Sequence, residues 1–96
     1  MDKLKPSQYL RLGSKQIEQA YCQYLHSNHN VVDKACPLGM MAVARAGTLD
    51  SKECCKALAE IMDMLPSKYI DHIVDMNDRV LKTPKEIADW LEEKGY

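Results

Sequence analysis

The segment that most constrains the fold is the ten-residue stretch 37–46, PLGMMAVARA, in which Arg45 is the only charged residue. Pro37 suits the first position of a helix, and Gly47 suits the residue just past its end. A short helix that is apolar on nearly every face has to be buried. The sequence therefore predicts a central helix from Pro37 to Ala46, with small residues that allow neighbours to approach closely: Gly39, Ala42, Ala44 and Ala46.

Four more helices are predicted from apolar residues at helical spacing and from capping residues at the ends. Gly13 lies on the apolar stripe of the first helix, where it would allow a close contact. The clearest local start is Thr83 followed by Pro84 and Glu86, which is a capping-box pattern. The expected helices run from about Ser7 to Tyr24, from Asp50 to Pro66, from about Ser67 to a break at Asn77-Asp78, and from Thr83 to Gly95.

The segment from His26 to Lys34 is read as a loop or a short β-hairpin. Its Asn and Ser residues favour turns, and Val31-Val32 favours extended structure. The fold class expected for the 96 residues is all-α or mainly α, a single helical domain built as a compact bundle of about five short helices, with at most one short β-hairpin at 26–34.

The charge balance excludes some classes of partner. Thirteen basic residues face fourteen acidic ones, and a net charge of −1 gives no general attraction for nucleic acid or for an anionic membrane. No apolar stretch approaches the roughly 20 residues that span a bilayer, and the N-terminus lacks a secretory signal. We expect a cytoplasmic protein whose four cysteines are reduced.

Four residues suggest a zinc site: Cys22, His26, His29 and Cys36, separated by three, two and six residues. Thiolate and imidazole are the preferred tetrahedral ligands of zinc, although this spacing matches no standard finger. The alternative is a buried Cys22, two solvent-facing histidines and a Cys36 that packs at a helix start.

Cys36 also raises the question of thiol chemistry, because it immediately precedes the predicted central helix. The positive end of a helix lowers the pKa of a nearby thiol, and His26, His29 and Asp33 are close in sequence. A Cys-His-Asp nucleophile is one interpretation, and a structural thiol is the other.

Polar residues far apart in sequence form a third candidate. Gln23 and the Asn77-Asp78 step could tie the first loop to the end of the fourth helix. Asn and Asp also end helices through local backbone bonds, which would explain them without a site. If these segments converge, they form a structural polar knot or a pocket from Cys22, Gln23, Cys36, Asn77 and Asp78.

Several short motifs resemble a family of small uncharacterised proteins found in phages and bacteria. The family's Trp positions are occupied here by Tyr21 and Met76. The resemblance implies a phage or prophage accessory protein and brings no activity with it. The matching residues are Tyr21-Cys22-Gln23, Cys36, Leu38-Gly39-Met40, Asn77-Asp78 and Thr83.

The function expected from these features is non-catalytic. We expect an accessory protein that binds a protein partner, in the host cytoplasm if a phage encodes it, and that could also self-associate as a homo-oligomer. Nucleic-acid binding is disfavoured because no recognition helix rich in basic and amide side chains stands out. The alternatives are a domain supported by a metal or small ligand at the Cys/His loop, and a thiol enzyme centred on Cys36.

Overall fold

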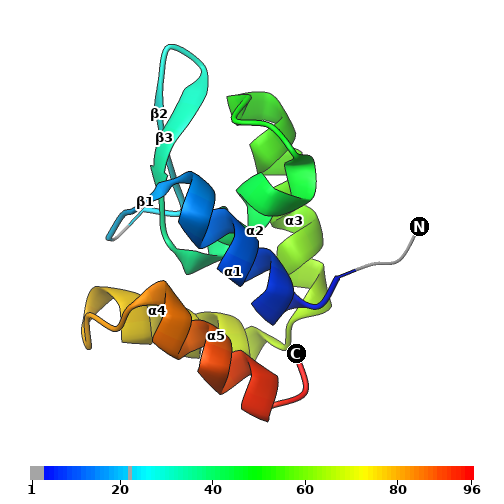
Figure 1. Cartoon of the computed structure of the whole chain (residues 1–96), viewed down its shortest axis with the longest axis vertical. Coiled ribbons are helices and arrows are strands. Elements are labelled where there is room, and N and C mark those ends of the chain that lie inside the picture. The colour runs from blue at the N-terminus through cyan, green and yellow to red at the C-terminus, as the bar shows by residue number, and fades with distance from the viewer. Residues whose placement is uncertain (1–3, 22) are drawn as a thin grey trace.

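The protein is mainly α-helical, with a small three-stranded sheet beside the helices (Figure 1). The computed structural model describes residues 4–21 and 23–96. In the order of the chain, the elements of this described part are α1 (Pro6–Gln16), β1 (Glu18–Gln19), β2 (Leu25–Asn28), β3 (Val31–Ala35), α2 (Pro37–Ala46), α3 (Ser51–Met64), α4 (Ser67–Asp78) and α5 (Pro84–Glu93).

The central helix α2 has the bounds that the sequence predicts. It begins at Pro37 and ends at Ala46, and Gly47 adopts the left-handed conformation with φ 69°. The first seven residues of α2 are buried, and the helix packs chiefly against α1 and α3. The hydrophobic core is therefore built around this helix, as its lack of charge indicates.

Two glycines let the backbone of α2 touch its neighbours. A Cβ atom on Gly13 of α1 would collide with the carbonyl oxygen of Met40, and one on Gly39 would collide with the carbonyl oxygen of Tyr24. Both positions admit only glycine at the observed spacing, because the obstructing atoms are backbone atoms that cannot swing aside. The close contact expected at Gly13 is confirmed.

The expectation of a mainly α chain is confirmed, but the β structure is more extensive than one hairpin, because a mixed sheet with the strand order β1-β3-β2 lies beside the helices. The β2–β3 hairpin turns at His29 and Asn30, whose φ angles of 54° and 65° match the tight turn that suits twisted antiparallel strands. The hairpin reading of this segment is confirmed. In Figure 1 the hairpin lies at the end of the molecule opposite α4 and α5, and backbone hydrogen bonds from Val32 to Leu49 and from Ser51 to Asn30 join it to the α2–α3 connection.

The first helix is shorter than predicted. It ends at Gln16, and Ile17 is extended, with φ −150° and ψ 150°. The next two residues then form β1, in which Glu18 pairs with Lys34 and Gln19 pairs with Ala35 in parallel. Helical periodicity continues to Tyr24 in the sequence, but the hydrogen bonds offered by β3 draw the backbone out of the helix.

Helix α4 packs against α2, and helix α5 packs against α1. The predicted end of the fourth helix at Asn77-Asp78 is confirmed, although both residues still belong to the final turn of α4. The start of α5 is confirmed, with Thr83 and Glu86 forming a reciprocal capping box. Among the helices of the described residues, none is long and apolar enough to cross a membrane.

We expect Gly39→Ala to lower the free energy of unfolding by more than about 3 kcal/mol, which a urea titration would measure. Alanine would add about 1 kcal/mol of helix propensity, so a destabilised variant means that the backbone collision wins. Gly47→Ala is the control, because its Cβ meets open space and only the positive φ costs about 1 kcal/mol. Equal effects of the two substitutions would contradict the close contact.

Candidate functional site

A buried amide joins three separate segments of the chain. Asn77, at the end of α4, is fully buried and donates from Nδ2 to the carbonyl oxygen of Ala20 at 2.9 Å. Its Oδ1 accepts a 2.6 Å hydrogen bond from Nε2 of Gln19, which also donates to the carbonyl oxygen of Lys82 at 3.0 Å. A further bond of 2.8 Å runs from Nδ2 to Asp78. The end of β1, the end of α4 and the α4–α5 connection are thereby held together.

The structure contains only part of the predicted polar knot. Asn77 is at its centre, but its glutamine partner is Gln19, while Gln23 is exposed. Cys36 lies close enough to Asp78 for that carboxylate to disfavour the thiolate. Cys22 lies outside the described residues. The sequence does not reveal Gln19 as this partner, because helical periodicity places it in the interior of a longer first helix.

Four exposed apolar residues lie in the two connections that this buried amide ties together. We name Tyr21, Tyr24, Val80 and Leu81 the loop patch. The connections that carry them are neighbours, because Gln19 bonds to Lys82 (Figure 1). Val80 is 54% exposed and Leu81 is 64% exposed, and Leu81 has a positive φ of 57°. Nothing in the sequence marks this position, because a left-handed residue is ordinarily signalled by Gly or Asn.

The predicted zinc ligands are spread along the hairpin. His26 lies on β2, where its Nδ1 contacts Oδ1 of Asp33, and His29 lies in the turn. Cys36 follows β3, whose five residues span roughly 16 Å and separate it from His29. Within residues 4–21 and 23–96 no three His, Cys, Asp or Glu side chains are grouped to hold a metal. With Cys22 outside the described residues, zinc binding stays a prediction.

The environment of Cys36 disfavours its thiolate, so the thiol is not activated as a nucleophile. Burial raises its pKa to about 11, against which the N–H groups of Gly39 and Leu38 favour the thiolate only in part. The expected lowering by the start of α2 is therefore wrong, because the loss of water outweighs the helix end.

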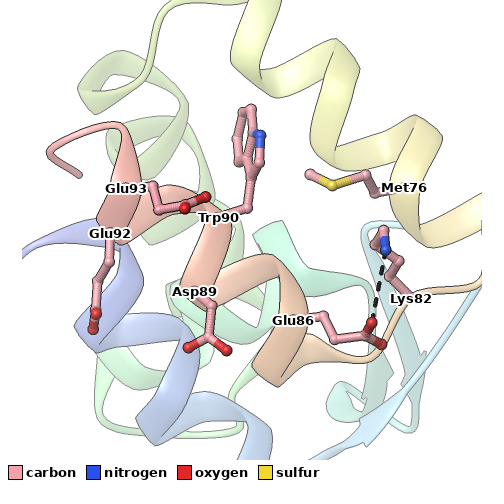
Figure 2. Close-up of a pocket in the computed structure, with 7 residues that line it drawn as sticks. All are labelled: Met76, Lys82, Glu86, Asp89, Trp90, Glu92 and Glu93. Atoms are coloured by element: carbon pink, nitrogen blue, oxygen red, sulfur yellow. Dashed lines mark ion pairs between the residues drawn. The ribbon is translucent and has the colours of Figure 1, made fainter.

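A groove about 710 Å³ in volume runs along α5 (Figure 2), and three of its four acidic side chains form ion pairs. Arg11 of α1 contacts Asp89 at 2.6 Å and Glu92 at 3.0 Å, and Lys82 contacts Glu86 at 3.7 Å. These pairs offset part of the acidic charge of the groove. The lining residues are Met76, Lys82, Glu86, Asp89, Trp90, Glu92 and Glu93.

Comparison of the chain with protein-family models, with curated proteins and with solved structures finds no match in any of the three. The resemblance to phage and bacterial proteins therefore stays a prediction.

We expect Asn77→Ala to cost about 3 kcal/mol of unfolding free energy, because it leaves a buried carbonyl and the amide of Gln19 without their partner. Asn28→Ala on the exposed strand β2 is the control, with an effect within about 0.5 kcal/mol. Combining Asn77→Ala with Gln19→Ala should give less than the sum of the single effects in a double-mutant cycle. Additive effects would contradict the amide pair.

A Cys22→Ser background would test the buried thiol with a thiol-reactive chromophore at pH 8. Exposed Cys55 should react quickly, whereas Cys36 and Cys54 should react only on unfolding. Because the pKa of Cys36 is higher in the folded chain, its contribution to stability is complete below about pH 9 and is lost as the pH rises through about 11. Labelling of Cys36 at the rate of Cys55, located by mass spectrometry, would contradict its burial.

Proposed function

We propose that the protein is a non-catalytic module that binds a protein partner through the loop patch. The observation that carries the proposal is Leu81, a leucine held in the left-handed conformation with most of its side chain in water. In this conformation a residue with a Cβ costs roughly 1–2 kcal/mol. Asparagine or glycine would avoid much of that cost, and leucine gains little from burial in the free chain, where it is 64% exposed.

Docking against an apolar pocket would recover energy that the free chain does not have. Burying a leucine side chain contributes about 2 kcal/mol, which is comparable to the conformational cost at this position. Tyr21 and Tyr24 add aromatic side chains of the type that is enriched at protein interfaces. The partner expected from this chemistry presents an apolar pocket that receives Leu81 and a rim that contacts the tyrosines.

The buried amide supports this function because it positions the exposed residues before binding. Asn77 and Gln19 hold the segments next to Tyr21 and Leu81 through bonds to Ala20 and Lys82. Ordering a loop on binding reduces affinity, and a loop that is already fixed avoids this loss. A phage or prophage accessory role in the host cytoplasm belongs to the same proposal.

The test compares two leucine variants as immobilised baits. Leu81→Asn keeps a residue that tolerates a positive φ, and Leu12→Gln removes an exposed leucine from α1 as the matched control. We expect wild type and Leu12→Gln to retain the same partner, and Leu81→Asn to bind it at least about 30-fold more weakly. The melting temperature of Leu81→Asn should equal or exceed that of wild type.

Two results would contradict this function. One is an unchanged set of retained proteins from the Leu81→Asn bait. The other is a lower melting temperature for Leu81→Asn, which would mean that Leu81 is needed for the fold itself. Sedimentation of the free protein over a range of concentrations separates a second copy of this chain from a different partner. Self-association that Leu81→Asn abolishes would make the partner a second copy.

A further inference from the structure

A cleft of about 350 Å³ opens between the first turns of α4 and the end of α5. Lys68, Tyr69 and His72 line it from α4, and Trp90 and Lys94 line it from α5 and the residue that follows. The cleft lies at the opposite end of the α4–α5 pair from the loop patch. Its volume is at the lower end of the roughly 300–1,000 Å³ that is usual for small-molecule sites.

The walls of the cleft are aromatic rings at stacking distances. The ring of His72 is stacked on the indole of Trp90, with centroids 4.8 Å apart and planes inclined by 20°. Tyr69 approaches the same indole edge-on, at 5.2 Å and 72°. Trp90 is only partly buried. A planar ligand ring can extend such a stack, because aromatic pairs favour offset parallel and edge-on geometries.

The charge of the cleft is positive and is not neutralised within it. None of the five lining residues is acidic. The ammonium groups of Lys68 and Lys94 lie 5.6 Å and 5.9 Å from the centroids of Tyr69 and Trp90, respectively. Neither lysine forms an ion pair with a carboxylate anywhere in the described part of the chain. This distinguishes the cleft from the α5 groove, which is lined by four carboxylates and one lysine.

The start of α4 adds to the positive field. Pro66 caps this helix without a side-chain hydrogen bond, and no acidic residue stands in its first turn. The partial positive charge of the helix end is therefore not offset there. The end of α5 contributes the opposite sign, and Lys94 stands at that end and compensates for it. The balance favours an anion next to Lys68.

We propose that this cleft binds a mononucleotide unit, with the base stacked against the aromatic rings and the phosphate held between Lys68 and Lys94. Inorganic phosphate would use only the lysines, and an uncharged nucleoside would use only the rings. A ligand that joins a planar ring to a phosphate uses both, and the volume suits one such unit. This site does not depend on the loop patch, so either can fail without the other.

Trp90 provides the readout, because it is the only tryptophan in the chain. Titration with AMP should change its fluorescence saturably and shift its indole N–H resonance. Adenosine and inorganic phosphate should each bind at least about tenfold more weakly. Comparison with a short single-stranded oligoadenylate identifies the source. Tighter binding of the strand points to single-stranded nucleic acid, and equal or weaker binding points to the free nucleotide.

Two variants separate the cleft from general surface charge. The double variant Lys68→Gln/Lys94→Gln keeps the reporter indole and should weaken AMP binding about tenfold or more. Lys85→Gln removes another exposed lysine of α5, one that pairs with Asp89, and should leave binding within about twofold. Leu81→Asn should bind AMP as wild type does, whatever its effect on the protein partner.

The proposal is overturned if AMP gives no saturable response at millimolar concentration. It is equally overturned if the double variant responds as wild type does, or if adenosine binds as tightly as AMP. Thermal melts of each variant show that the fold is retained, so a lost response reports the cleft and not unfolding.

Discussion

The architecture depends on how closely the backbone of α2 approaches its neighbours. Gly39 lies against the carbonyl group of Tyr24, and Gly13 lies against that of Met40. The contact at Gly39 is reinforced by a 3.2 Å hydrogen bond from the N–H of Cys36 to the same carbonyl oxygen. These contacts fix two parts of the chain against α2. One is helix α1, and the other is the β1–β2 connection, which contacts the first turn of α2. The sheet therefore exists because the chain around Tyr24 is held on α2, and not because its short strands are stable alone.

The buried amide of Asn77 connects the sheet to α4. Ala20 donates its N–H to the carbonyl oxygen of Ala35 at 2.8 Å, and its own carbonyl oxygen accepts from Asn77. A continuous path of hydrogen bonds thus runs from β3 to the end of α4 and, through Gln19, to Lys82. Such a path is costly to interrupt, since each buried polar group relies on its neighbour. It also explains why the connection after α4 can tolerate the positive φ of Leu81.

The sequence predicts the elements whose signals are local. Pro37 and Gly47 bound α2, and Thr83 with Glu86 starts α5, because caps depend on residues three or four apart. The end of α1 and the strand β1 depend instead on pairing with Lys34 and Ala35. Helical periodicity in the sequence carries no information about this pairing. In the same way, the polar character of Asn77 is visible in the sequence, but its partner Gln19 is set by tertiary contact. An exposed, left-handed leucine carries no sequence signal at all.

The α4–α5 pair keeps the loop patch and the aromatic cleft physically independent. From Tyr69 to Val80 the helix and its final turn rise by roughly 16 Å. That separation is about twice the Debye length of about 8 Å at physiological ionic strength, so charge bound beside Lys68 is largely screened at Leu81. Any influence of one surface on the other has to pass along α4, which Trp90 contacts near its start and which the hydrogen bonds of Asn77 tie to β1 and Ala20 at its end. Specific contacts thus hold both ends of α4, so two surfaces of different chemistry can act separately.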